Sequence, residues 1–181
     1  TATIPLSLFP AEEDGLDVSN IKQLVMELQG LGAIMIDEMK IVEYHPKNIA
    51  GKKVLPPSNV KLQTPAIVFE DAFKNVWGLA KMECRNYSLS TEKPNSGSTC
   101  VHMKWQDQKD CQWMEWGTSW TEWKGVDMDN ALQDGILEFY VRTSEIIRAD
   151  LPLQVGFQSY NGATTYVSLK SDYSAQKQYG M

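Results

Sequence analysis

The stretch that decides the fold is Gly135-Ile136-Leu137-Glu138-Phe139-Tyr140-Val141-Arg142. Apolar and polar side chains alternate along it, which puts Leu137, Phe139 and Val141 on one face of an extended chain. A period of two residues is typical of a β-strand that buries one face and exposes the other. The stretch therefore predicts a half-buried strand.

The same alternation continues toward the C-terminus. Residues 151–160 repeat it, and Asn161-Gly162 then supplies the turn chemistry of a tight hairpin into residues 164–169. Strands follow one another without helical patterns between them, so no helix is expected to link parallel strands. We therefore predict an all-β fold, an antiparallel two-sheet β-sandwich.

Residues 23–29, which follow an expected turn at residues 19–21, fit two kinds of element. Alternating apolar and polar residues favour a strand, but apolar residues in the same window also recur at helical spacing. We favour the strand, because Gly30 and Gly32 then form a hairpin into residues 33–42. The helix remains the alternative.

Composition divides the chain into three parts. Residues 45–65 are rich in Pro, Lys, Asn and Gly and poor in large apolar side chains, which is typical of an extended linker. We expect residues 1–44 to supply the closing strands of the sandwich. Residues 66–181 are expected to supply its opening and central strands.

The charge balance excludes two classes of partner. A net charge of -6 and a pI near 4.9 oppose binding to phosphate backbones, and no Lys/Arg cluster is interleaved with aromatic residues. No apolar run approaches the roughly 20 residues that span a membrane. We therefore expect neither nucleic acid nor a membrane as a partner.

The three cysteines are Cys84, Cys100 and Cys111, and their spacing fits no zinc site. An odd count allows at most one disulfide within the chain. Either the thiols are buried or partly buried, or Cys84 and Cys100 form a bridge between adjacent strands; the disulfide state stays open.

Several short motifs resemble those of one group of binding modules. They are Phe69-Glu70-Asp71 with Trp77, Ile4-Pro5-Leu6, Asn20-Ile21-Lys22, Ile36-Asp37-Glu38-Met39, Trp116-Gly117 and Trp123-Lys124-Gly125-Val126-Asp127. On these motifs the chain is similar to non-catalytic carbohydrate-binding modules of the β-jelly-roll type, as in families 4, 11 and 22. The resemblance implies a jelly-roll, galactose-binding-like sandwich.

The motifs stand in an unusual order, because the closing segment precedes the opening one. One interpretation is a circularly permuted module, in which residues 2–6 pair with strands of the C-terminal half and Thr1 lies close to Met181. The other is a piece cut from two tandem modules and completed by exchange between chains.

The resemblance also implies a structural calcium ion. Glu70 or Asp71, together with Asp37, would hold it, since carboxylate oxygens suit the six to eight ligands of calcium. The alternative is that these are ordinary solvated charges.

A sugar-binding face needs flat aromatic rings for stacking and amides, carboxylates or guanidinium groups for hydrogen bonds. Outward positions of the predicted strands, including Glu138 and Gln154, carry such groups. By alternation, one of Trp113 and Trp116 should also point outward. The predicted carbohydrate-binding residues are Trp113, Tyr140, Arg142, Gln158, Tyr160, Glu27 and Gln29.

These observations predict a module that binds a β-linked, β-glucan-like polysaccharide outside the cell or at its surface and targets an attached glycoside hydrolase. A structural or adhesion sandwich is the main alternative. Hydrolysis by Glu115 with Glu122 or Glu138 is a third, but the chain lacks the Glu-x-Asp-x-x-Glu cluster of jelly-roll glucanases and any Gly-x-Ser-x-Gly elbow. We predict no catalysis.

Overall fold

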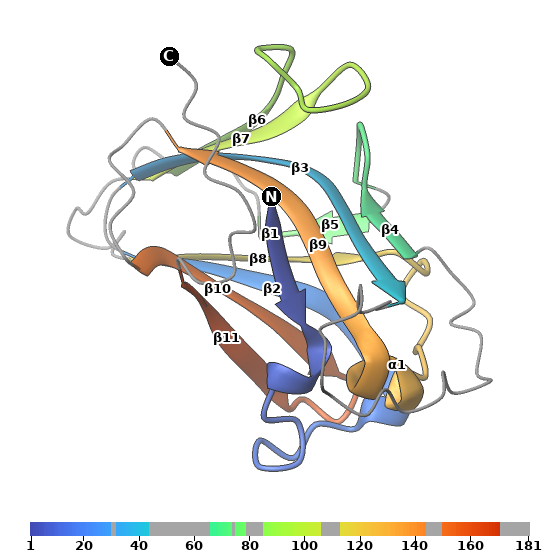
Figure 1. Cartoon of the computed structure of the whole chain (residues 1–181). Coiled ribbons are helices and arrows are strands. Elements are labelled where there is room, and N and C mark those ends of the chain that lie inside the picture. The colour runs from blue at the N-terminus through green and yellow to red at the C-terminus, as the bar shows by residue number, and fades with distance from the viewer. Residues whose placement is uncertain are drawn as a thin grey trace, which may run out of the picture.

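The structure is a computed structural model, and it describes residues 1–29, 32–43, 66–73, 75–78, 85–105, 113–143 and 150–170. Within these ranges eleven strands form two sheets that face each other, and every strand pair is antiparallel (Figure 1). The predicted all-β, two-sheet β-sandwich is confirmed.

The first sheet is built around β3 and is called the β3 sheet below. Its strand order is β1-β9-β3-β7-β6, and β4 also pairs with β3. The strands are β1 (Ala2–Pro5), β3 (Gly32–Glu43), β4 (Ala66–Phe69), β6 (Arg85–Ser90), β7 (Cys100–Trp105) and β9 (Gly135–Thr143).

The second sheet is built around β2 and is called the β2 sheet. Its order is β11-β10-β2-β8-β5. The strands are β2 (Ile21–Gln29), β5 (Asn75–Trp77), β8 (Trp113–Ser119), β10 (Asp150–Ser159) and β11 (Thr164–Lys170). The prediction of a strand over residues 23–29 is confirmed and the helical alternative is wrong; the strand begins at Ile21, which was expected in the preceding turn.

The N-terminal segment is woven into both sheets. β2 lies between β10 and β8, and β3 lies between β9 and β7. The predicted pairing with the C-terminal half is confirmed for β1, in which Ala2 pairs with Phe139 and Ile4 with Leu137. The predicted linker, residues 45–65, and the predicted closeness of Thr1 to Met181 lie outside the described residues.

The core lies between the two sheets. Trp116, Phe139 and Phe157 are fully buried there, and Phe73 contacts the Trp116 ring with 5.0 Å between centroids. Each fully buried large apolar side chain stabilises the fold by about 1.5 to 3 kcal/mol. Trp116, which the sequence left ambiguous between core and surface, is a core residue.

Short helical elements close one end of the sandwich. They are η1 (Leu6–Leu8), η2 (Val18–Asn20) and α1 (Asp129–Asp134). Asp17 caps η2 by accepting a hydrogen bond from the Ser19 amide at 3.2 Å. Among the helices of the described ranges, none has the length and apolar character needed to cross a membrane.

Cys100 carries a buried free thiol at the start of β7. Burial, reinforced by the nearby charge of Asp37, raises the pKa of this thiol. Cys84 and Cys111 lie outside the described residues, so this finding concerns Cys100 alone.

Candidate functional site

The outer face of the β2 sheet is the side turned away from the core. Along β2 the side chains of Leu24, Met26 and Leu28 enter the core, so the alternate residues Val25 and Glu27 lie on the outer face. Cross-strand pairing extends this face into one row across five strands. From β11 to β5 the row reads Tyr166, Gly156, Val25, Gly117 and Trp77.

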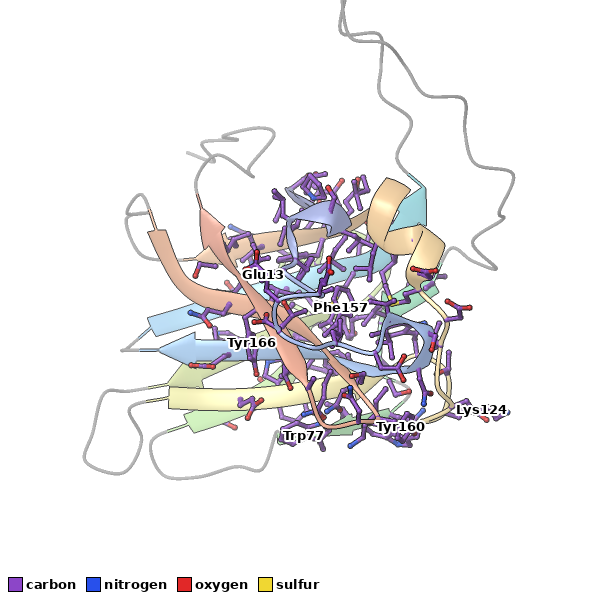
Figure 2. All side chains as sticks on the ribbon, turned by 90° about the horizontal axis from the view of Figure 1, so that it is seen from below. Glu13, Trp77, Lys124, Phe157, Tyr160 and Tyr166 are labelled. Atoms are coloured by element: carbon purple, nitrogen blue, oxygen red, sulfur yellow. The ribbon has the colours of Figure 1, made fainter. Side chains whose placement is uncertain are left out.

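Two aromatic rings lie against glycines in this row. A Cβ atom added to Gly156 would lie 2.7 Å from Cδ1 of Tyr166, and one added to Gly117 would meet Nε1 of Trp77. Only a glycine leaves room for a ring so close to the backbone. Trp77 nevertheless remains 39% exposed, while Val25 between the two glycines is 0% exposed. Figure 2, seen from below, shows Trp77 and Tyr166 on this side of the molecule.

A chain of side-chain hydrogen bonds crosses the face beside the aromatic row. Trp77 Nε1 donates to Gln23 Oε1, and Gln23 Nε2 donates to Gln158 Oε1 at 2.6 Å. Gln158 Nε2 in turn donates to Thr164 Oγ1 at 3.1 Å. These bonds link β5, β2, β10 and β11. They hold the polar side chains in fixed positions before any ligand arrives.

Two carboxylates occupy the next row. Glu27 and Glu115 lie directly opposite each other on β2 and β8. The Tyr166 hydroxyl donates to Glu115 Oε1 at 2.9 Å, so the ring reaches across the face from β11 toward β8. Burial, and then the contact with Glu115, raise the pKa of Tyr166 well above its usual range. Because an unperturbed tyrosine titrates only at about pH 10, the hydroxyl is protonated at neutral pH and can donate this bond.

The structure brings together part of the predicted site. Glu27 and Gln158 lie on this outer face, and Tyr160 follows directly after β10 with 46% of its surface exposed. Gln29 and Trp113 pair with each other at one end of β2 and β8. The side chains of these last two lie outside what the structure describes.

Tyr140 and Arg142 lie elsewhere, and this corrects the sequence interpretation. Both belong to β9, which pairs with β1 and β3, whereas Gln158 belongs to β10 in the other sheet. The predicted set is therefore divided between the two sheets, and sugar binding by Tyr140 and Arg142 stays a prediction. Alternation determines which side chains of a strand point outward, but it does not determine which sheet the strand joins.

A loop covers part of the outer face of the β3 sheet. Residues 91–99 connect β6 to β7, and the Asn95 and Ser96 amides donate to Asp37 Oδ2 at 2.5 and 3.2 Å. Asp37 is only 3% exposed beneath this loop. Arg142 donates to the Glu92 carbonyl at 3.0 Å. The loop therefore covers Asp37 and contacts Arg142, whose side chain stays exposed.

Two of the three residues predicted to hold calcium, Asp71 and Asp37, hold this same loop. Asp71 Oδ1 accepts hydrogen bonds from the Ser98 and Thr99 amides at 2.7 and 2.8 Å, while Asp37 accepts those from Asn95 and Ser96. Among the described residues, no group of three or more His, Cys, Asp or Glu side chains forms a metal site. The carboxylates of Asp37 and Asp71 hold the loop by accepting hydrogen bonds from its amides. Calcium binding at Glu70, Asp71 and Asp37 stays a prediction.

Sequence reasoning missed the centre of this face. Trp77 was noted only as part of a motif, and Tyr166, Gln23 and Glu115 were not placed in the binding set. The usable signal was an isolated glycine inside a predicted strand, which indicates a close approach by another group. Gly156 gave that signal within the strand predicted over residues 151–160.

Comparison with known proteins identifies the family. The family model described as carbohydrate binding domain 30 matches residues 65–179, which contain β4 to β11. No curated protein and no solved structure gives a significant match. Similarity to families 4, 11 and 22 stays a prediction. The chain belongs to the carbohydrate binding domain 30 family and is a carbohydrate-binding module.

Proposed function

We propose that the chain binds a β-linked polysaccharide on the outer face of the β2 sheet and does not cleave it. The observation that carries the proposal is the placement of Trp77 and Tyr166 against Gly117 and Gly156. A ring held against the backbone is fixed on one side, and its partly exposed surface suits stacking on the apolar face of a sugar. Equatorially linked sugars present such flat faces along an extended chain.

The polar groups around the rings suit the edges of the same sugars. Gln158 is held in place by the hydrogen-bond chain, in which Gln23 is a buried support at 1% exposure, and Glu27 and Glu115 supply carboxylate acceptors for hydroxyl groups. Because such a face is open and wet, each neutral hydrogen bond contributes about 1 kcal/mol. We expect dissociation constants in the micromolar range or weaker.

The carboxylate pairs considered for hydrolysis are poorly arranged for it. Glu115 lies in β8 of the β2 sheet, whereas Glu138 lies in β9 of the β3 sheet and pairs with Lys40 Nζ at 3.2 Å. Glu122 is 78% exposed in the chain that follows β8. Hydrolysis requires two carboxyl groups that flank one glycosidic bond. These placements support binding without cleavage.

The proposal also concerns the enzyme to which the module is attached and the place where the two act. Binding alone changes nothing in a polysaccharide, so we propose that the module directs an attached glycoside hydrolase to its substrate, outside the cell or at its surface. A structural or adhesion sandwich is the competing function. It would give no retardation in any polysaccharide gel.

The test is affinity electrophoresis in gels containing β-glucan, xyloglucan, mannan or xylan. We expect retardation in at least one gel, and Trp77→Ala to weaken that binding at least tenfold, which is about 1.4 kcal/mol. Tyr140→Ala is the matched control, since it removes an aromatic ring from the outer face of the other sheet. Unchanged binding by Trp77→Ala, or loss of binding by Tyr140→Ala instead, would contradict the proposed face.

A further inference from the structure

The turn between Thr121 and Lys124 has an unusual backbone. The Lys124 amide donates to the Thr121 carbonyl at 3.1 Å, and the two central residues, Glu122 and Trp123, have φ angles of 54° and 62°. Tight turns with two positive φ angles normally use Asn, Asp or Gly at their centre. A tryptophan in this conformation is disfavoured sterically, and such outliers cluster at functional sites.

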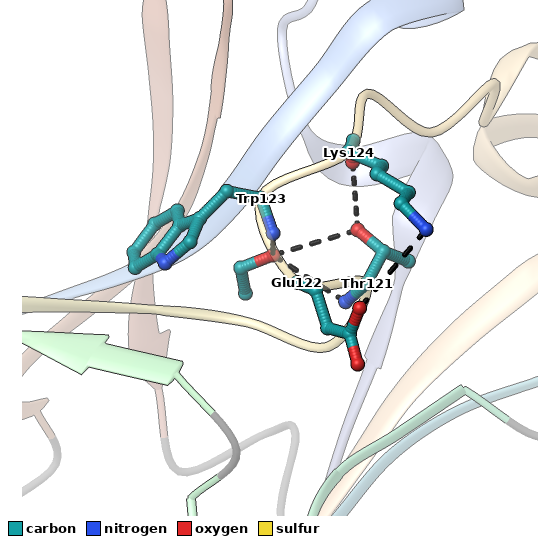
Figure 3. A network of polar contacts seen from close by, with 5 residues as sticks. Thr121, Glu122, Trp123 and Lys124 are labelled. Atoms are coloured by element: carbon teal, nitrogen blue, oxygen red, sulfur yellow. Dashed lines mark hydrogen bonds and ion pairs between the residues drawn. The ribbon is translucent and has the colours of Figure 1, made fainter.

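Three hydrogen bonds hold Trp123 in place. Its amide donates to Ser119 Oγ at 2.9 Å, and its carbonyl accepts from the Tyr160 hydroxyl. Thr121 Oγ1 closes the turn by donating to the Lys124 carbonyl at 2.7 Å. Figure 3 shows the turn network with the Trp123 indole pointing away from it. These bonds therefore fix the backbone of the turn and leave the half-buried indole free of the turn's own hydrogen bonds.

The indole of Trp123 serves no evident purpose in the core. Trp120, three residues earlier, packs against the core and contacts Phe157, with 6.5 Å between ring centroids. Trp123 is half-buried and is not among the core-packed side chains of the described residues. A bulky residue kept in a disfavoured backbone conformation without a core contact needs another explanation.

Trp123 is tied to the binding face through Tyr160. Tyr160 follows Gln158, a face residue, by two positions, and Lys22 Nζ lies 5.9 Å from the centroid of its ring. Ser119, which holds the Trp123 amide, pairs with Asn75 beside Trp77 on the edge strand β5. Tyr160 lies four positions after Gly156, just past the end of β10, and four steps of an extended chain span about 14 Å. Trp123 and Tyr160 thus lie beyond the row that contains Trp77 and Tyr166, at one end of the same face.

We propose that Trp123 is a further sugar-stacking residue, presented by the strained turn at the Tyr160 end of the face. It extends the site so that longer chains bind more tightly than Trp77 and Tyr166 alone allow. The inference rests on the proposed function of the β2 sheet face. It adds a preference for longer sugar chains. It also explains the disfavoured backbone conformation of Trp123 by a role in binding rather than in stability.

The deciding variant is Trp123→Gly, because glycine adopts positive φ angles without steric cost. Relief of strain offsets lost indole contacts, so we expect the melting temperature to stay within about 4 °C of the unmodified chain. Affinity is measured by calorimetry with trisaccharides and hexasaccharides of β-1,4-linked glucose, xylose and mannose. We expect roughly tenfold loss for the hexasaccharide and little change for the trisaccharide.

Two more variants sharpen the test. Glu122→Gly is the matched control, since it relieves the neighbouring strained residue without removing an aromatic ring, and its affinities should match the unmodified chain at both lengths. Tyr160→Phe keeps the ring but removes the hydroxyl bond to the Trp123 carbonyl, and should lower hexasaccharide affinity in the same direction by a smaller factor.

Three outcomes would overturn the inference. The first is a Trp123→Gly chain that binds both lengths as the unmodified chain does. The second is an equal loss at both lengths, and the third is a fall in melting temperature beyond about 4 °C with loss of binding, which would indicate a structural role. If the unmodified chain binds no saccharide at all, the proposed function itself fails, so the two failures are distinguishable.

Discussion

At the scale of single residues, two glycines decide where the aromatic rings lie. Gly117 and Gly156 are strand-interior positions, where glycine normally weakens a strand. Each lies beneath a ring contributed by a neighbouring strand, Trp77 or Tyr166. Glycine lowers the strand propensity at these two positions, but it allows two aromatic rings to pack directly against the sheet.

The variant Gly117→Ala tests this arrangement. Its methyl group would meet Trp77 Nε1 and Gln23 Oε1, so we expect the indole to be displaced and stability to fall by about 1 to 3 kcal/mol. Polysaccharide binding should fall about as far as in Trp77→Ala. When Gly117→Ala and Trp77→Ala are combined, binding should fall little below that of either single variant, because both changes remove the same contact. Additive losses in binding would show that the glycine acts independently of the ring.

A second prediction concerns the carboxylates on the same face. Glu27 and Glu115 lie directly opposite each other, and like charges in that position destabilise a sheet. Glu115→Gln removes one charge and keeps an oxygen that accepts from the Tyr166 hydroxyl. We expect stability at neutral pH to rise by about 0.2 to 1 kcal/mol, measured by urea denaturation. A fall in stability would mean that the charge itself supports the native face.

At the scale of elements, the loop at residues 91–99 is held from both flanks by carboxylates. Asp37 on β3 accepts amides from the middle of the loop, and Asp71, which follows β4, accepts amides from its end. The same contacts lower the pKa of Asp71, chiefly through the Thr99 amide and then that of Ser98. The loop is therefore a place where stability depends on pH.

The pH dependence has a defined sign. A carboxylate whose folded pKa is lowered stabilises the folded chain above its unfolded pKa, about 3.9 for Asp, and loses that effect as pH falls through the folded value. We expect Asp71→Asn to be less stable than the unmodified chain near pH 7, and the difference to shrink below about pH 4. Urea denaturation across this pH range measures it. A difference that persists unchanged at acid pH would argue against the carboxylate as its source.

At the element scale the sequence predicted the strands well and their assembly poorly. Alternation is local, so the strands at residues 135–143 and 150–159 were recoverable from their side chains alone. Which sheet each strand joins depends on pairing between distant segments, and Tyr140 was therefore grouped with Gln158. The roles of Trp77 and Tyr166 depend on glycines in adjacent strands, which no single stretch of sequence reveals.

At the scale of the whole molecule, the N-terminal segment is essential to both sheets. The family match begins at residue 65, yet residues 1–43 supply β2 and β3, the middle strand in the order of each sheet. Without them, β10 and β8 in one sheet, and β9 and β7 in the other, lose the strand that joins them. The match therefore covers less than the folded unit.

This leads to a prediction about a fragment. Residues 65–181 alone should show no cooperative thermal unfolding, because the removal of β2 and β3 leaves both sheets divided and much of the core exposed. Adding a peptide of residues 1–43 should restore a cooperative transition. Circular dichroism and calorimetry measure both. A fragment that unfolds cooperatively by itself would show that its strands can re-pair without the N-terminal segment.

The most direct measurement for the whole account is a map of backbone amide chemical shifts by NMR during titration with a β-1,4-linked hexasaccharide of the sugar that binds best. We expect the largest changes in β5, β8, β2 and β10, around Trp77, Gly117 and Gly156. Changes concentrated in β9, β3 and β7, on the outer face that carries Tyr140 and Arg142, would contradict it.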